Sequence, residues 1–157
     1  MRGNKAFIFY FLMNIILLDF GNHLRKIFQN PYLAQKINND IFTIFNVNNT
    51  GSAFSLFQNN AKTLAIFGIV AVVFIAFYVF KFVSFEDKNK LLSLTIFSAG
   101  ALGNAIERLN YGYVIDYVKL NFIDFPVFNA FDIMICIGIG LYCLSILLDL
   151  KHGTNKN

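Results

Sequence analysis

The stretch TLAIFGIVAVVFIAFYVFKFVSF, residues 63–85, decides the fold class, because Lys81 is the only charged residue in it. At about 1.5 Å per residue, a helix of this length spans the roughly 30 Å hydrocarbon core of a bilayer. The whole chain agrees: 57% of its 157 residues are apolar and 14% are charged, against globular norms of roughly 45–50% and 25%. A soluble domain of this size cannot bury so much apolar surface, and disordered chains are charged and poor in aromatic residues. The sequence therefore predicts an integral membrane protein.

Three further apolar segments predict three more membrane helices. They run from Ala6 to about Phe20, from Leu91 to Leu109 and from Phe128 to Leu150. The first follows basic residues, as in a secretory signal peptide, but no small-residue cleavage pattern comes after it, so we expect a retained helix. We thus predict an integral membrane α-helical fold, one domain of residues 1–157 with four transmembrane helices at about 6–20, 63–85, 91–109 and 128–150.

The basic residues predict an orientation. They are denser in the two terminal segments and around residues 81–90 than in the two longer connections, which by the positive-inside rule places both termini in the cytoplasm. Residues 21–62 and 110–127 then form outer segments. The first contains the β-rich Ile41–Phe45, the turn-forming Asn48–Gly51 and the apolar Ala53–Phe57, and residues 111–125 mix β-branched and aromatic residues. We expect a small extracytoplasmic β-rich subdomain.

Polar residues gather at the edges of the last two apolar segments. Gly100, Asn104 and Arg108 recur every four residues, which places them on one stripe of the third helix. Asn129 and Asp132 share a face at the start of the fourth helix, and Asp116 lies in the connection between the two helices. If these helices are neighbours, Asp116 and Asp132 meet at the outer boundary of the membrane.

Two carboxylates at one site have a specific chemical use. Like charges a few ångströms apart cannot both ionise easily, so the pair holds one proton. The ionised member can take a proton from water while the protonated member donates one, which permits peptide hydrolysis without a metal or a covalent intermediate. The same residues also fit a simpler interpretation, with Asp116 an exposed loop residue and Asp132 a helix charge favoured by the macrodipole. Spacing alone favours that simpler interpretation.

Other chemistries have little support in the sequence. Cys136 and Cys143 lie roughly 10 Å apart along one predicted helix, too far for a disulfide. His23 and His152 have no neighbours at metal-ligand spacing, and the basic residues are scattered. We expect no metal site, no cofactor and no nucleic-acid partner.

Four blocks of the chain, taken together, resemble the signature blocks of the prokaryotic lipoprotein signal peptidases (signal peptidase II). In order they are Asn49-Thr50-Gly51-Ser52-Ala53-Phe54-Ser55, Gly100-Ala101-Leu102-Gly103-Asn104-Ala105-Ile106-Glu107-Arg108-Leu109, Val114-Ile115-Asp116-Tyr117 and Phe128-Asn129-Ala130-Phe131-Asp132. Each block is weak alone. Four in order, with matching spacing and four spans, extend the resemblance over nearly the whole chain.

The resemblance implies an aspartyl endopeptidase of the bacterial inner membrane, which cuts the signal peptide from prolipoproteins before a cysteine that carries diacylglycerol. It implies that Asp116 and Asp132 are the catalytic pair. The supporting residues that it implies are Asp19, Asn49, Gly51, Asn104, Arg108 and Asn129. Its partners would be diacylated prolipoprotein signal peptides and membrane lipids, and we expect a monomer.

The chain departs from the family pattern at three positions. His23 stands where the family usually has a lysine, four residues after Asp19, and Glu107 stands where an aspartate is common. Phe131 precedes Asp132, where the family usually has alanine. None of these changes removes a catalytic group, but Phe131 bears on the packing beside Asp132.

Two other functions are alternatives. A small transporter or channel subunit could use Asp and Arg as an ion path, but it predicts ionisable residues near mid-membrane and repeat symmetry. Here the acids lie at segment edges and no repeat is visible. A non-catalytic assembly factor could use the polar stripe to bind partner helices, and replacement of both aspartates would separate it from an enzyme.

Overall fold

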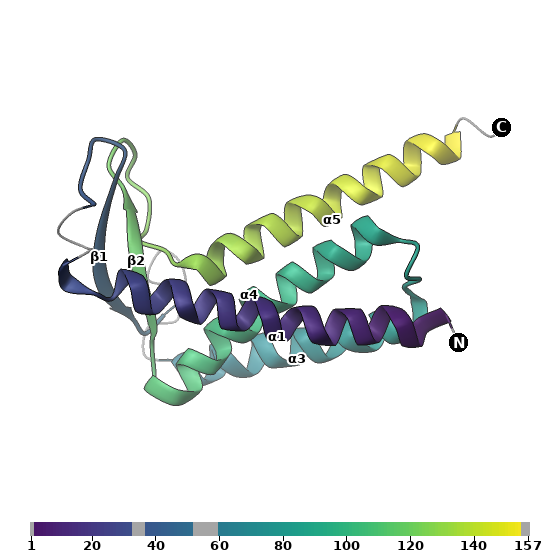
Figure 1. The fold of residues 1–157 in the computed structure, drawn as a ribbon, viewed down its shortest axis with the longest axis horizontal. Helices are drawn as coiled ribbons and strands as arrows, with labels where there is room; N and C mark the ends of the chain where they lie inside the picture. Colours follow the sequence, from purple (N-terminus) through teal and green to yellow (C-terminus); the bar gives the residue numbers. More distant parts are fainter. Residues whose placement is uncertain (1, 33–36, 52–59, 155–157) are drawn as a thin grey trace.

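Each of the four apolar segments forms a long helix, and each outer segment contributes one strand to a small sheet (Figure 1). The structure, a computed structural model, describes residues 2–32, 37–51 and 60–154. The elements in chain order are α1 (Arg2–Phe28), β1 (Phe42–Asn49), α3 (Ala61–Phe82), α4 (Lys88–Tyr111), β2 (Val114–Leu120) and α5 (Ala130–Thr154). The sheet lies at one end of the helices, while the N-terminal end of α1 and the C-terminal end of α5 lie at the other (Figure 1).

Three of the described helices are long and apolar enough to cross a membrane. They comprise residues Asn4–Phe28, Ala61–Phe82 and Ala130–Lys151. Large apolar side chains on them, such as Phe67, Phe74 and Leu147, are more than half exposed. Contiguous exposed apolar surface of this kind marks contact with a membrane or a partner. The predicted membrane α-helical fold is confirmed to the extent that three of the described helices are long and apolar enough to cross a membrane.

The remaining long helix, α4, is more polar than the other three. It packs against all of them, so its polar residues can face protein rather than lipid. Its buried residues are mostly small or polar, among them Ser93, Thr95, Ser98, Ala99, Gly100, Ala101, Gly103, Asn104 and Ala105. Small residues allow helix backbones to approach closely, and a methyl group on Gly138 of α5 would overlap the backbone of Phe97. The Thr95 hydroxyl donates to the carbonyl of Leu91 at 2.7 Å, so its polarity is satisfied within its own helix.

The sheet brings two distant parts of the chain together. β1 pairs antiparallel with β2, with Val47 opposite Asp116 and Asn49 opposite Val114. Because side chains alternate between the faces of a strand, Asn49 and Asp116 lie on the same face. Gly112 ends α4 with φ +79°, a left-handed conformation that glycine adopts without strain, and so turns the chain from α4 into β2.

The ends of several elements differ from those expected. α1 continues to Phe28, well past the expected end near Phe20, so residues 21–28 are helical rather than part of an outer segment. Its last turn carries Arg25 and Lys26, cations that favour the negative end of a helix dipole. The predicted turn at Asn48 and Asn49 is wrong, because pairing with β2 extends the strand through both residues. The second strand expected at Ala53–Phe57 lies outside the described residues.

Candidate active site

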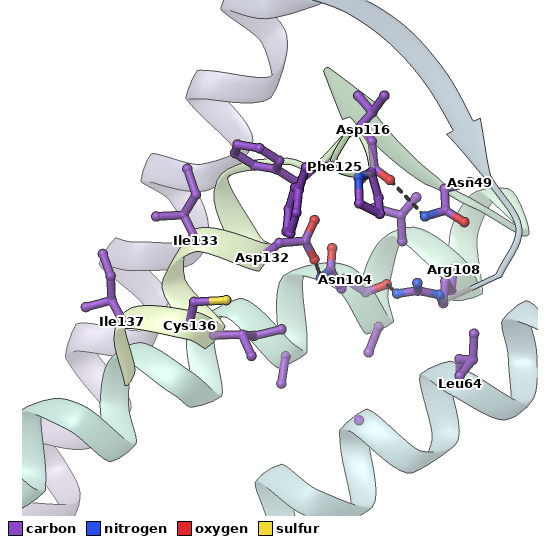
Figure 2. Close-up of a pocket in the computed structure, with 18 of the residues that line it drawn as sticks. Asn49, Leu64, Asn104, Arg108, Asp116, Phe125, Asp132, Ile133, Cys136 and Ile137 are labelled. Carbon is purple, nitrogen blue, oxygen red and sulfur yellow. Dashed lines mark hydrogen bonds between the residues drawn. The ribbon is translucent and has the colours of Figure 1, made fainter. Parts of the chain in front are cut away.

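A cavity of about 570 Å³ opens between the helices below the sheet (Figure 2). Its polar end is lined by Asn49, Asn104, Arg108, Asp116 and Asp132. Apolar and small residues line the rest, including Leu64, Gly68, Ala101, Ala105, Phe125, Ile133, Cys136 and Ile137. The cavity therefore offers a long apolar surface that ends at two carboxyl groups.

The start of α5 fixes Asp132 through a reciprocal cap. Asn129 Oδ1 accepts hydrogen bonds from the backbone N–H groups of Phe131 at 2.7 Å and Asp132 at 3.1 Å. In return, the backbone N–H of Asn129 donates to Asp132 Oδ2 at 3.0 Å. This arrangement satisfies orphan donors at a helix N-terminus, as in a capping box. The Asp132 side chain is thereby held by the same residue that caps its helix.

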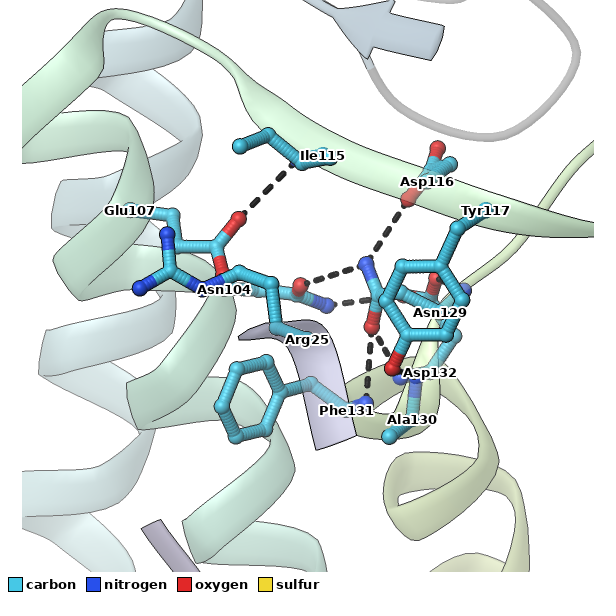
Figure 3. Close-up of polar contacts among 10 residues, drawn as sticks. All are labelled: Arg25, Asn104, Glu107, Ile115, Asp116, Tyr117, Asn129, Ala130, Phe131 and Asp132. Carbon is cyan, nitrogen blue, oxygen red and sulfur yellow. Dashed lines mark hydrogen bonds and ion pairs between the residues drawn. The ribbon is translucent and has the colours of Figure 1, made fainter. Parts of the chain in front are cut away.

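Asn129 also joins α5 to β2. Its Nδ2 donates to Asp116 Oδ1 at 2.7 Å, and Asn49 Nδ2 donates to Asp116 Oδ2 at 2.8 Å (Figures 2 and 3). Both oxygens of Asp116 thus accept a hydrogen bond from an asparagine. The pairing of β1 with β2 makes the Asn49 contact possible, although the two residues lie far apart in sequence.

Asn104 completes the connection between the two carboxyl groups. Its Nδ2 donates to Asp132 Oδ1 at 2.7 Å, and its Oδ1 accepts a hydrogen bond from Asn129 Nδ2 at 3.2 Å (Figure 3). Together with the cap, this gives both oxygens of Asp132 a donor. Buried carboxylates cost several kcal/mol unless they are hydrogen-bonded or paired, and three asparagines meet that requirement here.

Arg108 supplies the positive charge of the site. Its Nη2 donates to the carbonyl oxygen of Gly51 at 2.8 Å, and its Nη1 donates to the carbonyl oxygen of Asn104 at 3.3 Å. Gly51 in turn donates its backbone N–H to Asn49 Oδ1 at 3.0 Å. The guanidinium therefore ties α4 to the residues that follow β1, on the polar side of the cavity.

The environment of Asp116 favours its protonated form. The side chain is only 3% exposed, and burial, followed by the nearby charge of Asp132, raises the pKa of Asp116 from 3.8 to about 6. Hydrogen bonds from Asn49 and Asn129 and the charge of Arg108 oppose this rise. A carboxyl group that titrates near neutrality can hold or release a proton during a reaction.

Tyr117 is a supporting residue that the sequence analysis missed. Its hydroxyl accepts a hydrogen bond from the Ala130 backbone N–H at 3.0 Å, and its ring stacks on Phe28 with centroids 5.1 Å apart. Burial raises the pKa of Tyr117 to about 12, so the phenol stays neutral. Its position next to Asp116 in a predicted β-rich segment gave no signal that it would reach the first turn of α5.

Arg25 and Glu107 form a second support behind the site. Arg25 Nε lies 3.4 Å from Glu107 Oε1, and Glu107 Oε2 accepts a hydrogen bond from the Ile115 backbone N–H at 2.9 Å (Figure 3). α1, α4 and the start of β2 are thereby connected, one residue before Asp116. A buried glutamate in an apolar segment requires a partner, which was a usable signal, but the sequence did not identify Arg25 as that partner.

The structure brings most of the predicted site residues together. Asp116, Asp132 and the supporting residues Asn49, Gly51, Asn104, Arg108 and Asn129 form one hydrogen-bonded group. Asp19 instead lies on α1 with an exposed side chain and is not part of the cavity lining. Within the part of the chain that the structure describes, no hydrogen bond or ion pair joins Asp19 to His23. A role for Asp19 stays a prediction.

The chemistry available here is proton transfer beside an apolar cavity. Two carboxyl groups, an arginine and three asparagine amides can donate to or accept from a polar group that enters from the apolar side. Over residues 2–32, 37–51 and 60–154, no group of three or more His, Cys, Asp or Glu residues could hold a metal ion. The arrangement supports general acid–base chemistry on a substrate that is largely apolar.

Sequence comparisons agree on one family. The family model described as "Signal peptidase (SPase) II" matches residues 11–148. A lipoprotein signal peptidase of Buchnera aphidicola subsp. Schizaphis graminum (strain Sg) is 42% identical over 136 residues, covering 79% of this chain and 83% of the relative. A lipoprotein signal peptidase of Dehalococcoides mccartyi is 38% identical over 121 residues, covering 74% of each chain.

Two solved structures share the fold. Both are described as bacterial membrane enzymes whose structures were obtained by the in meso method, at 2.3 Å and 1.9 Å resolution. The first has a TM-score of 0.78 at 22% identity and covers 91% of this chain and 90% of its own. The second has a TM-score of 0.70 at 21% identity, and the match covers 88% of this chain and 92% of the solved chain. At these identities the likeness concerns the fold.

The raised pKa of Asp116 leads to a prediction about stability. Because the folded-state pKa lies above the ordinary value, the favourable contribution of the protonated group is complete below about pH 4 and is lost as the pH rises through about 6. The loss amounts to about 3 kcal/mol at roughly 1.4 kcal/mol per pKa unit. We therefore expect Asp116→Asn to gain stability relative to the wild type between about pH 4 and pH 7.

Thermal unfolding in detergent micelles at a series of pH values measures this gain. Asp124→Asn, at an exposed aspartate in the same connection, is the matched control for an Asp-to-Asn substitution outside the site. A difference for Asp116→Asn that is constant or falls over the same range would contradict the raised pKa.

Proposed function

The chain belongs to the signal peptidase II family, and from that premise we propose that Asp116 and Asp132 are the catalytic pair of this membrane protease. The enzyme removes signal peptides from prolipoproteins. One observation carries the assignment of the pair: the two carboxyl groups lie at the polar end of an apolar cavity and are joined through Asn129 and Asn104. No other described aspartate lines this cavity.

The pair hydrolyses the peptide bond by general acid–base catalysis. With one proton shared between the two carboxyl groups, the ionised member accepts a proton from water as the water oxygen attacks the scissile carbonyl carbon. The protonated member then donates its proton to the leaving nitrogen, and the pair again holds one proton. Burial and the charge of Asp132 raise the pKa of Asp116 to about 6, so this carboxyl group can take up and release a proton near neutral pH.

The other polar groups position the substrate. Arg108 lines the cavity and carries its only positive charge among the described lining residues, so it orients backbone or lipid-phosphate oxygens. The apolar walls accept the signal peptide and the acyl chains of a diacylglyceryl-modified cysteine. Cleavage therefore depends on the lipid as well as on the peptide.

The topology follows from the same arrangement. α4, with 24 residues, is long enough to cross a bilayer at about 1.5 Å per residue, and its polar residues face protein rather than lipid. Four crossings place the N-terminal end of α1 and the C-terminal end of α5 on one side, as in Figure 1. By the charge distribution that side is the cytoplasm, so the sheet and the carboxyl pair lie on the outer face of the bacterial inner membrane. The protein acts as a monomer.

Replacing either catalytic carboxyl tests the pair. Asp116→Asn and Asp132→Asn keep the shape of the side chain but remove the exchangeable proton, so each should lower turnover of a lipidated precursor by at least about 100-fold. Asp124→Asn and Asp149→Asn alter exposed aspartates outside the cavity and should stay within about twofold of the wild type. Near-normal turnover by a folded Asp116→Asn or Asp132→Asn protein would overturn the mechanism.

Dependence on the lipid is tested with two forms of one precursor peptide. The purified enzyme should cleave the diacylated peptide at least about tenfold faster than the unmodified peptide, because only the former fills the apolar cavity. Equal rates on both peptides would indicate a general intramembrane protease instead.

Orientation is tested with a reporter fused after residue 157. A reporter that is active only in the cytoplasm should be active, and one that is active only in the outer compartment should be silent. The opposite pattern would reverse the proposed topology.

A further inference from the structure

The ring of Phe131 fills a slot between α1 and α4. Phe131 is only 2% exposed, and the slot has glycine on both sides. A methyl group on Gly21 of α1 would overlap Cε1 and Cζ of the ring, and one on Gly103 of α4 would overlap Cδ1, Cε1 and Cγ. Figure 3 shows the side chain directed away from Asp116 and toward α1. The slot exists only because both of these helical positions lack a side chain.

The slot lies directly behind the carboxyl pair. Phe131 precedes Asp132, and the backbone N–H groups of both residues donate to the same oxygen, Asn129 Oδ1. On α4, Gly103 precedes Asn104, whose Nδ2 donates to Asp132 Oδ1. Two consecutive residues of α4 therefore contact two consecutive residues of α5: one contact fills the slot and the next holds the carboxyl group.

We propose that Phe131 is a positioning residue, which sets the rotation of the first turn of α5 through its seat between Gly21 and Gly103 and so places Asp132 against Asn104. The inference depends on the proposed function, because Asp132 must be catalytic for its placement to affect the rate. A helix turn can rotate about its axis unless a side chain fixes it, and closely packed interiors transmit such displacements. A displaced Asp132 loses the geometry that general acid–base catalysis requires.

The proposal requires that ring and slot match in size, which substitutions can test in pairs. Gly21→Ala pushes the ring outward and should lower kcat by at least about tenfold, since small misplacements of reacting groups cost about this much or more. Phe131→Leu lacks Cε1 and Cζ, the two ring atoms that lie closest to a methyl group at Gly21, and keeps Cγ and both Cδ atoms, of which Cδ1 lies at 3.0 Å. Gly21→Ala combined with Phe131→Leu should therefore recover kcat to within about threefold of Phe131→Leu alone.

Gly103→Ala is the matched control for this recovery. Its methyl group would overlap Cγ and Cδ1, which leucine retains, so Phe131→Leu should not restore the activity of Gly103→Ala. Gly140→Ala gives the baseline, because among the described residues no atom beyond its own stretch of helix lies within 4 Å of a methyl group at that position, and it should cleave at the wild-type rate.

The pH profile separates positioning from a general loss of folded protein. All variants are purified in detergent micelles and assayed on the diacylated precursor across the pH range, with the folded fraction measured in parallel. A rotated Asp132 changes its electrostatic effect on Asp116. The pH at which the cleavage rate changes should therefore shift by at least about 0.5 unit in Gly21→Ala and return to the wild-type pH in the double variant. A smaller folded fraction lowers the rate at every pH equally.

The outcomes are distinct. The proposal is overturned if Gly21→Ala has wild-type activity, or if Phe131→Leu does not restore the activity of Gly21→Ala. It is also overturned if the pH profile is unshifted and the rate falls only as much as the folded fraction. If Gly21→Ala does not fold, Phe131→Ala empties the slot instead, and wild-type rate and profile in that variant overturn it equally. A wild-type protein that leaves the precursor uncut contradicts the proposed function itself, whereas cleavage by the wild type with no effect at Gly21 contradicts only the role of Phe131.

Discussion

Two carboxyl groups, Asp116 buried and Asp132 half-buried, lie at the end of an apolar cavity and must be supplied with hydrogen-bond donors. This constraint organises the structure. Asn129 meets it with one side chain: its oxygen caps α5, and its amide donates to Asp116 and Asn104. Asn49 and Asn104 supply the remaining side-chain donors. Because these residues come from β1, α4 and the start of α5, the site forms only when those elements meet.

The same constraint explains why α4 differs from its neighbours. Lipid-facing helices are stabilised by apolar side chains on their outer surface, whereas α4 lies among α1, α3 and α5 and carries Asn104, Glu107 and Arg108. Its polar groups face partners in protein, such as the Glu107 contacts with Arg25 and with the Ile115 backbone. The polar residues that make α4 less apolar than a typical membrane helix are the ones that support the two carboxyl groups.

Much of this arrangement could be predicted from the sequence. Apolar length predicted the helices, and the four sequence blocks predicted the family, which the comparisons confirm. The pairing of β1 with β2 was harder, since β-rich composition indicates strands but not their partners. The extent of α1 to Phe28 was missed because the helix outlasts its apolar segment and is stabilised by tertiary contacts such as the Arg25–Glu107 pair. The fit of Phe131 between Gly21 and Gly103 could not be predicted, because it depends on side-chain packing across three helices.

The central claim is that the active enzyme carries one proton on the Asp116–Asp132 pair. The pH dependence of kcat/KM on a diacylated precursor measures it most directly, because such a profile reports the essential acid and base of the free enzyme. The account predicts a bell-shaped profile in which the rate falls when the pair holds two protons and falls again when it holds none. A rate that rises once with pH and then stays constant would indicate a single ionised group and would contradict the account.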